Sequence, residues 1–357
     1  MLYRRLAFPL LLLFLTVLLF LFHITAFIHL FFTHAGITIT QNEILDAYTA
    51  DQDLAVGVRR ESYVPKIVHQ VFHNWKEPGN ETLPSDWEVV SGTCKGRAKG
   101  WSGEWEYMLW TESTSRQFIQ DEYPWMLKTY DGYRYPVQRV DAVRYFVLYH
   151  YGGIYLDLDN GCLRDLTPLT NYPLWNTDGG RGALSNNILG ARPKHPFYDR
   201  LIRSLITYNY NYFFPYITIS YASGQWFETS VWEKYHASLP SLLKGPMTSK
   251  GGQGGGSEFG KGEEMRGFRI MMDDRPGTEP WIFFTQERGG SWVNWDNAFW
   301  LWIGEHLLLL AVVAGGSLSG VGWYCIKGPR GRRRRVGGRD VRVGLGKKDD
   351  MRVLPDV

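Results

Sequence analysis

Two aspartates near the middle of the chain, Asp157 and Asp159, have the type and spacing that a site for a metal ion and a diphosphate requires. The run from Ile154 to Asp159 is predicted to be a β-strand, along which side chains alternate between two faces. Both carboxylates would then share one face with Tyr155, about 7 Å apart at their backbones. Carboxylate oxygens are hard ligands suited to a divalent cation that bridges to a diphosphate.

The residues around this pair decide between a metal site and its alternative, a solvated acidic turn. An isolated Asp-x-Asp would favour the turn. Here Gly152 and Gly153 end the preceding helix, and Ile154, Leu156 and Leu158 give the strand a continuous apolar face. This pattern favours the metal site, because ligands of open α/β sheets bind outside the carboxyl ends of strands.

The element before this strand is predicted to be a helix over residues 136–151 that begins with proline. Its valines recur at helical spacing and should face the core. Asp141 and Arg144 share a different face, one turn apart. They form either an ordinary helical ion pair, worth roughly a few tenths of a kcal/mol, or part of the same site as the two aspartates.

Short runs rich in β-branched and aromatic residues, at 63–72 and 107–111, are predicted to be further strands, and residues 114–122 a helix. Strands that alternate with helices indicate an α/β domain with a mostly parallel sheet. His69, in the first strand, is interpreted as a packed histidine, because geometry and not residue type makes a general base.

Four of the six tryptophans that precede the helix at 136–151 are considered as binding residues: Trp75, Trp101, Trp105 and Trp110. Each offers a stacking surface for a base or a sugar. The interpretation preferred here is that most of them belong to the core, where large aromatic side chains usually lie.

Both ends of the chain carry long apolar runs. Residues 6–32 are almost entirely Leu, Phe, Val and Ile, which exceeds the ~20 residues that a membrane-spanning helix needs. Arg4 and Arg5 precede this run and place the N-terminus in the cytosol. We therefore predict a signal anchor, with a cleaved signal peptide as the alternative. Residues 305–326 form a second predicted span, or else a buried helix, and the basic cluster behind it indicates a cytosolic end.

These signals divide the chain into six segments. In order they are a cytosolic tip (1–5), the signal anchor (6–32), a stem (33–62), a lumenal catalytic domain (63–302), the second span (305–326) and a basic cytosolic tail (327–357). A glycine-rich stretch at about 246–266 is predicted to be a flexible insertion, since it lacks the lysine and Ser/Thr spacing of a P-loop. The formal net charge is +3, and no nucleic-acid partner is expected.

Cysteines and sequons are few. Cys94 and Cys162 are the only cysteines of the predicted lumenal part. They either form a disulfide in an oxidising compartment or remain buried free thiols, because two cysteines make no framework. Asn80 begins the single glycosylation sequon of that part.

Several segments resemble the glycosyltransferases that carry the DXD sugar-binding motif, and within that group the fungal family 32 enzymes. The matching segments are Pro65–Gln70, Gln138–Arg144, Tyr151–Asp159, Asn186-Asn187 followed by Gly190–Pro196, and Gly290-Ser291-Trp292. The resemblance extends from about Tyr63 to Trp302, and the Asp-x-Asp block is its most specific part. The family includes α-1,6-mannosyltransferases and catalytic subunits of mannosyl inositolphosphorylceramide synthase. The second predicted span points towards the latter.

The resemblance implies a GT-A-type nucleotide-sugar-binding domain. Asp159 would ligate the metal directly, which is expected to be Mn²⁺. Asp157 would contact the ribose of the sugar nucleotide or the shell of the metal. Asp141 and Arg144 match the pair that holds the donor sugar and the diphosphate.

The resemblance also assigns residues further along the chain. Asn187 would line the donor or acceptor site, and Ser291 and Trp292 would close over the diphosphate. One position departs from the family, where histidine commonly follows the Ser-Trp pair. Here it is Val293, which can ligate neither a metal nor a phosphate. Asp296, Asn294 and His306 are the substitutes in reach along the sequence.

The expected function is metal-dependent, retaining transfer of mannose from GDP-mannose to a membrane lipid, inositolphosphorylceramide. The enzyme would lie in the Golgi membrane with its catalytic domain lumenal and both termini cytosolic, and a regulatory membrane subunit is a candidate partner. One alternative is α-1,6-mannosyl transfer to protein-linked glycans. A second is a glycosidase, whose two carboxylates lie ~5–10 Å apart. A third, motivated by Val293, is a non-catalytic partner subunit with a decayed site.

Overall fold

The computed structural model describes most of residues 33–306 and fragments of the two apolar ends. The residues outside the description are 1–10, 13, 20, 24, 26–32, 54–61, 99, 181, 244–261, 274–276, 288, 290–292, 307–308, 311, 314 and 318–357. The chain forms two compact units, 1–297 and 298–357, which are considered separately.

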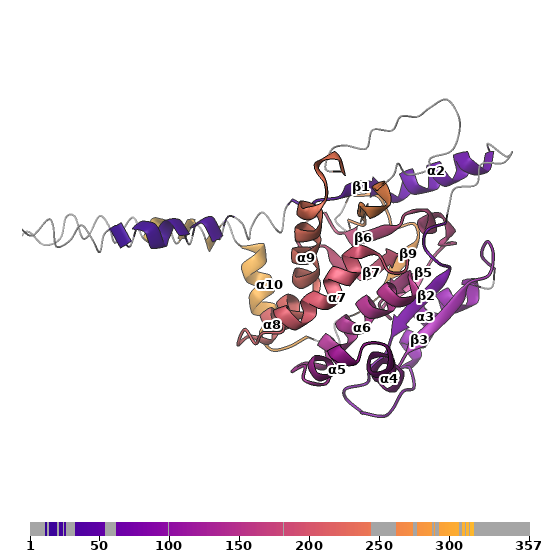
Figure 1. Cartoon of the computed structure of the whole chain (residues 1–357), viewed down its shortest axis with the longest axis horizontal. Helices are drawn as coiled ribbons and strands as arrows, with labels where there is room; N and C mark the ends of the chain where they lie inside the picture. The colour runs from indigo at the N-terminus through magenta and orange to yellow at the C-terminus, as the bar shows by residue number, and fades with distance from the viewer. Residues whose placement is uncertain are drawn as a thin grey trace, which may run out of the picture. The chain divides into compact units, whose positions relative to one another are not determined.

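A seven-stranded sheet forms the centre of the first unit, with the strand order β1-β8-β6-β7-β4-β2-β3 (Figure 1). Its strands are β1 (Ile37–Thr40), β2 (Ile67–Val71), β3 (Glu106–Trp110), β4 (Gly153–Leu156), β6 (Leu174–Asp178), β7 (Ser185–Ala191) and β8 (Phe268–Met271). Among these strands, β7 alone runs antiparallel to its neighbours, and the other pairs are parallel. The predicted α/β fold with a mostly parallel sheet is confirmed.

Helices cover both faces of the sheet. They are α2 (Gln41–Asp53), α3 (Ser85–Ala98), α4 (Glu112–Glu122), α5 (Pro124–Asp131), α6 (Pro136–Tyr151), α7 (Pro196–Tyr208), α8 (Pro215–Ala222) and α9 (Gln225–Ser238). Ile154 and Leu156 of β4 pack in a cluster with side chains of α2 and α3. Tyr155, on the opposite face, packs with α4 to α7 and α9. The alternation predicted for this strand therefore holds as far as Leu156.

Helix α6 spans the predicted residues and leads directly into β4. Gly152 follows it with φ of 68°, a conformation that suits glycine. A Cβ at Gly152 would also lie 2.7 Å from Cδ of Pro193. Both the backbone conformation and the lack of space therefore require glycine at this position. The helix is buried nearly all round, and its buried residues include Asp141 and Arg144. Two charged groups are thus carried into the interior, where each needs a partner.

The expected stem and the end of the predicted insertion both contribute to the folded domain. Within the expected stem, β1 pairs with β8 at the edge of the sheet, and Ile44 of α2 is buried. The predicted insertion at 246–266 lies outside the described residues up to 261. Its last part forms a 3₁₀ turn, Glu263–Met265, and the hydroxyl of Tyr235 donates to the carbonyl of Met265 (2.7 Å).

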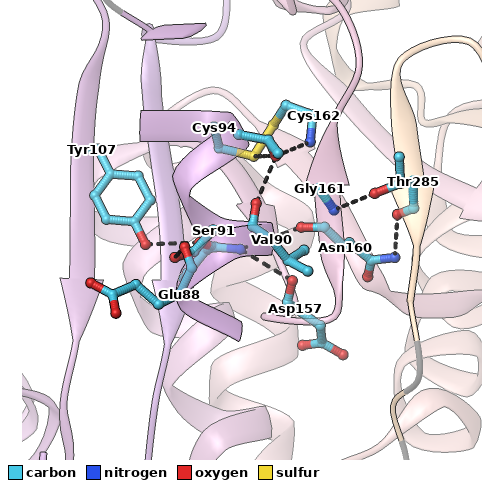
Figure 2. Close-up of a disulfide and its surroundings, with 12 residues drawn as sticks. Glu88, Val90, Ser91, Cys94, Tyr107, Asp157, Asn160, Gly161, Cys162 and Thr285 are labelled. Atoms are coloured by element: carbon cyan, nitrogen blue, oxygen red, sulfur yellow. Dashed lines mark hydrogen bonds between the residues drawn. A yellow bond between two sulfur atoms is a disulfide. The ribbon is translucent and has the colours of Figure 1, made fainter. Parts of the chain in front are cut away.

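A disulfide joins Cys94 of α3 to Cys162, 68 residues further on (Figure 2). Cys162 belongs to β5 (Asn160–Cys162), which pairs with β9 (Phe284–Gln286) in a small second sheet. The backbone N–H of Cys162 also donates to Oγ1 of Thr93 (2.9 Å). Of the two states left open by the sequence, the structure has the disulfide and not the free thiols.

The second unit contains most of α10 (Asn297–Glu305). Among the helices described, none has both the length and the hydropathy that crossing a bilayer demands. The predicted spans at 6–32 and 305–326 are described only in fragments, and the tail at 327–357 lies outside the described residues.

Removing the disulfide should destabilise the first unit. We expect the double variant Cys94→Ser/Cys162→Ser to lose about 2–4 kcal/mol of unfolding free energy, since a cross-link over a long loop restricts the unfolded chain. Denaturant unfolding of the full chain in detergent measures the loss. The single variant Cys325→Ser, which leaves the bridge intact, is the control. Equal stability of the double variant and the control would contradict the expectation.

Candidate active site

Asp157 and Asp159 lie in a tight turn at the carboxyl end of β4. The strand ends at Leu156, so the prediction of one continuous strand through Asp159 is wrong. The N–H of Asp157 still donates to the carbonyl of Asn187 in β7 (2.8 Å), but the N–H of Asn160 then donates to the carbonyl of Asp157 (3.0 Å) and turns the chain. The two carboxylates are therefore presented at the end of the strand and not along one of its faces.

Arg144 of α6 is the cation of this site. Its Nη2 lies 3.0 Å from Oδ1 of Asp141 and its Nη1 3.3 Å from Oδ1 of Asp157. Nη1 also donates to the carbonyl of Asn186 (2.5 Å). The Arg144 side chain is 4% exposed and that of Asp141 5%. The i,i+3 pair is therefore a buried link between the helix and the turn, and not an ordinary surface ion pair.

Each of the two carboxylates that flank Arg144 also accepts a hydrogen bond from a hydroxyl group. The hydroxyl of Tyr155 donates to Oδ1 of Asp157 (2.6 Å), and the guanidinium lies 4.9 Å from the centre of the Tyr155 ring. Oγ of Ser223 donates to Oδ2 of Asp141 (2.8 Å). Such a network is fixed in place, because moving one group would leave several buried polar atoms without partners.

The charges of this cluster depend on one another. Burial raises the pKa of both Asp141 and Asp157, and the charge of Arg144 opposes this shift. Burial also acts to lower the pKa of Arg144, but Asp157 and then Tyr155 and Asp141 raise that pKa well above its usual value. Arg144 therefore stays protonated. Its Nε is buried and has no hydrogen-bond partner among the described residues.

Asp159 is in a different environment. None of the described residues forms an ion pair with it, and its backbone carbonyl accepts from the N–H of Glu287 (2.7 Å). Burial, and then the nearby charge of Asp157, raise the pKa of Asp159 to about 6. A cation would stabilise the ionised form against both effects.

The donor set fits a hard divalent cation. Within the described part of the chain, no group of three or more His, Cys, Asp or Glu side chains could hold a metal ion. Asp157 and Asp159 would thus supply one or two carboxylate ligands, and a substrate diphosphate and water would supply the rest. That division is usual for Mg²⁺ and similar ions at phosphate-transfer sites.

Gly289 packs directly against Asp159. A Cβ at Gly289 would lie 1.9 Å from Oδ2 of Asp159, so any larger residue would displace the carboxylate. This glycine lies between β9 and the matching segment Gly290-Ser291-Trp292. Ser291 and Trp292, to which closure over the diphosphate was assigned, lie outside the described residues.

The family's histidine position is Val293 here, and Asp296 and His306 were two of the residues considered as its substitutes. Val293 is exposed. Asp296 is buried, and its Oδ2 accepts from the N–H of Tyr216 at the start of α8 (3.0 Å). Nδ1 of His306 lies 2.8 Å from the carbonyl of Trp302, within the second unit.

Asn187 supports the turn through its side chain as well as its backbone. Its Nδ2 donates to Oδ1 of Asn160 (3.2 Å), and its Oδ1 accepts from Oγ of Ser185 (2.6 Å). Asn160 in turn donates to the carbonyl of Thr285 in β9 (3.1 Å), as Figure 2 shows. The predicted contact of Asn187 with donor or acceptor stays a prediction, since these bonds place its amide against β5.

A hollow opens beside the turn, between β2, α3 and α6. Its lining residues are Val71, Phe72, His73, Trp75, Trp87, Val137, Val140, Arg144, Asp157, Leu158, Asp159 and Gly289. One of the four tryptophans considered from sequence, Trp75, lines it. Trp110 is instead buried and donates through Nε1 to Nδ1 of His69 (3.1 Å). Burial lowers the pKa of His69 to about 4, which confirms that it is a packed histidine.

Sequence reasoning missed Tyr155 as a donor to Asp157, assigned no role to Asn186 although it lies in a matching segment, and missed Ser223 and Gly289 altogether. Tyr155 was placed on the correct face of β4, but only the turn brings its hydroxyl back to the carboxylate. Ser223 lies 82 residues from Asp141, and no local pattern marks such a partner.

A further buried acid, Glu228 of α9, lies behind the cluster. Its Oε1 accepts from Nδ2 of Asn176 (2.8 Å), and Oε2 has no partner among the described residues. Burial raises the pKa of Glu228 to about 8. Glu228 is therefore largely neutral at pH 7.

An α/β domain with paired carboxylates and a buried arginine at the carboxyl end of a central strand has the features of an enzyme that binds a diphosphate-linked group. Comparison with known proteins agrees. Residues 92–175 match the family model described as "Glycosyltransferase sugar-binding region containing DXD motif". The matched region contains the disulfide, the α6 cluster and the turn.

Three yeast proteins are similar over most of the chain. Inositol phosphoceramide mannosyltransferase 2 of Schizosaccharomyces pombe is 34% identical, over 75% of this chain and 69% of its own length. Inositol phosphoceramide mannosyltransferase 3 of the same organism is 37% identical, over 68% of this chain and 60% of its own. Mannosyl phosphorylinositol ceramide synthase CSH1 of Saccharomyces cerevisiae is 32% identical, over 76% of this chain and 66% of its own.

The match thus spans between 60% and 69% of the length of these relatives. The chain belongs to the family of DXD-containing glycosyltransferases that includes these inositol phosphoceramide mannosyltransferases. Among solved structures, the PaToxG glycosyltransferase has a TM-score of 0.35 and 14% identity, over 54% of this chain and 76% of its own. A similarity this low adds nothing to the assignment.

Replacing Gly289 by alanine should weaken metal binding without unfolding the protein. The new Cβ would meet Oδ2 of Asp159 and force that carboxylate out of position. We expect the Kd for Mn²⁺, measured by titration calorimetry in the presence of GDP, to rise about tenfold, or ~1.4 kcal/mol. Gly92→Ala, whose Cβ meets nothing within 4 Å, is the control. Unchanged metal affinity in Gly289→Ala would show that Asp159 does not hold the ion.

The variant Glu228→Gln should stabilise the fold in a pH-dependent way. The folded-state pKa of Glu228 is about 8, against 4.5 for an ordinary glutamate. The folded state therefore holds the proton more tightly, and stability falls as the pH rises from 4.5 to 8. We expect the Tm of the variant to exceed that of the native protein by about 2–4 °C or more at pH 8, and by little at pH 4.5. Exposed Glu88, changed to Gln, should show no such trend.

Proposed function

We propose that this chain is a metal-dependent, retaining mannosyltransferase that moves mannose from GDP-mannose to inositol phosphoceramide. The observation that carries the proposal is the buried Arg144 held between Asp141 and Asp157, beside the carboxylate of Asp159, which forms no ion pair with any described residue. The names of the yeast relatives support both the sugar and the acceptor. The parallel strands that lead to the turn support a GT-A-type domain.

Asp159 and Asp157 would hold the cation, which we propose to be Mn²⁺. When bound, such an ion neutralises the charge that develops on a departing diphosphate. The two aspartates would have different roles in the site. Asp157 is already paired with Arg144 and Tyr155, so it fixes the distance between the arginine and the turn. Asp159 has no ion-pair partner among the described residues and would be the ligand that holds the ion.

Arg144 would bind the diphosphate from the other side. It lines the hollow, keeps its proton and has an Nε–H without a partner among the described residues. A charge-assisted hydrogen bond from a guanidinium to a phosphate oxygen is short and strong. Because Asp141 and Ser223 hold the arginine before substrate arrives, no reorganisation is needed when negative charge develops. Trp75 and Trp87 offer apolar walls for the rest of the donor.

The membrane organisation is proposed from the sequence. The apolar runs at 6–32 and 305–326 would anchor the enzyme in the Golgi membrane, with the catalytic domain lumenal and both termini cytosolic. The disulfide agrees with an oxidising lumen. A regulatory membrane subunit remains a candidate partner.

The test is mannosyl transfer by the full chain in detergent, with GDP-mannose, Mn²⁺ and inositol phosphoceramide. We expect a mannosylated lipid whose formation stops on chelation. Asp159→Asn and Arg144→Lys should each lower kcat by about 10²–10³, the usual cost of removing one group that stabilises developing charge. Asp121→Asn, on the surface of α4 where Asp121 accepts from Gln117, is the matched control.

Two outcomes would contradict the proposal in different ways. If the native chain does not bind GDP-mannose, the donor is wrong. If it binds the donor and the metal but forms no product with either the lipid or a protein-linked glycan, then the chain is a non-catalytic subunit. Product with the glycan alone would favour the α-1,6-mannosyltransferase alternative.

A further inference from the structure

One end of α8 carries a surface of exposed aromatic side chains, here called the aromatic surface and formed by Tyr210, Tyr212, Phe213 and Trp295. Phe213 is 78% exposed and Trp295 73%. Such side chains normally lie inside a protein or in an interface. Together they form a patch of the kind that marks an interaction site.

Phe213 is held in an exposed position by an energetically unfavourable backbone conformation. Its φ is 73°, a region that bulky side chains rarely occupy because Cβ meets the neighbouring backbone. The N–H of Phe214 donates to the carbonyl of Tyr212 (2.9 Å), which closes this tight turn around Phe213. A strained conformation that exposes a phenylalanine points to a function for the exposure.

Ring contacts connect the members of each segment. The ring centres of Tyr210 and Tyr212 lie 5.1 Å apart, those of Phe213 and Phe214 5.1 Å, and those of Phe214 and Trp295 5.9 Å. The segment of Trp295 is held by Asp296, whose carboxylate accepts from the N–H of Tyr216 in α8 (3.0 Å). Segments that are 80 residues apart in sequence therefore present aromatic groups at the same place.

The segment around Phe213 carries no charged side chain. Residues 204–227 contain no Asp, Glu, Lys or Arg, and nine of them are Tyr, Phe or Trp. The polar groups available here are hydroxyls, amides and the indole N–H. This combination of apolar rings and uncharged polar tips is the one enriched where proteins meet the headgroup level of a bilayer.

The chain itself leads from this surface to the second apolar run. Eleven residues lie between Trp295 and Leu307, which belongs to that run. Nine residues of α10 fall in this interval and rise only about 14 Å. Phe299, Leu301 and Trp302 of α10 are themselves exposed. A bilayer crossed by the apolar run thus lies within a short length of chain from the aromatic surface.

The opposite end of α8 reaches the active site. The eight residues Pro215–Ala222 rise about 12 Å. The next residue is Ser223, which bonds Asp141, and Asp141 holds Arg144. A group at the membrane surface would therefore be one short helix away from the charged cluster.

We propose that the aromatic surface docks on the lipid bilayer and sets the active site at the height of lipid headgroups. The inference rests on the proposed function, for which a membrane lipid is the acceptor. Docking would let the enzyme glycosylate a headgroup without withdrawing the lipid from the membrane. A lipid surface, and not a soluble protein, is the partner to which the proposal commits.

The test uses single cysteines on the full chain, reconstituted into phosphatidylcholine vesicles in a Cys325→Ser background. Phe213→Cys carries an environment-sensitive fluorophore, and Val89→Cys on α3, where Val89 is 72% exposed, carries the same label as the control. Nitroxide groups on lipid chains just below the headgroups should quench the label at 213 about twofold or more, since docked aromatic residues lie ~5–10 Å deep. The label at 89 should be unaffected.

A second arm separates docking from catalysis. Phe213→Ser/Trp295→Ser should lower transfer to vesicle-embedded acceptor about tenfold while GDP-mannose binding stays unchanged. The quenching measurement needs no activity, so it decides the docking even if the donor or acceptor is wrong. Equal quenching at both positions, or none at either, would overturn the proposal. A change at 213 that follows protein concentration and not lipid would also overturn it, in favour of a second copy of this chain.

Discussion

The candidate active site of this protein is organised around one buried positive charge. Arg144 sits on a helix that is enclosed on nearly all sides, and an arginine in such a place is tolerated only when its charge is matched. Asp141 on the same helix and Asp157 on the turn provide the match. The ion pairs therefore tie α6 to the end of β4, and the distance between the arginine and the turn is fixed before any substrate arrives. The remaining carboxylate, Asp159, forms no ion pair with any of the described residues.

Around this charge the protein uses distant parts of its chain as supports. Ser223 holds Asp141 from the start of the α8–α9 connection, and Asn186 bonds Arg144 from β7. On the opposite side, the N–H of Glu287 in the segment after β9 bonds the backbone of Asp159, while Gly289 contacts its carboxylate. The disulfide then fixes β5, which continues directly from the turn, to α3. The site is thus rigid on every side that the described residues cover.

Much of this was predictable from sequence, for identifiable reasons. The α/β fold, helix 136–151 and the burial of His69 follow from local patterns of apolar residues, proline and glycine. The pairing of Asp157 and Asp159 followed from residue type and spacing, although the predicted strand was too long, because hydrogen bonds from Asn160 and to Asn187 decide where β4 ends. Ser223, Asn186 and Gly289 were not predictable, since each acquires its role only from a contact across the fold. The position of β1 in the sheet could not be predicted for the same reason, because its partner β8 lies about 230 residues away in the sequence.

The small sheet of β5 and β9 has a consequence for the order in which the enzyme matures. The turn that holds Asp157 and Asp159 is synthesised before residue 160, yet the strand that follows it pairs with residues 284–286. Gly289, which shapes the pocket of Asp159, comes later still. A chain emerging from the ribosome therefore carries an incomplete candidate active site until nearly the whole first unit has been made. We therefore expect a partly synthesised chain to have no glycosyltransferase activity. The candidate site is completed only when β9 and Gly289 have been synthesised and have packed against the turn.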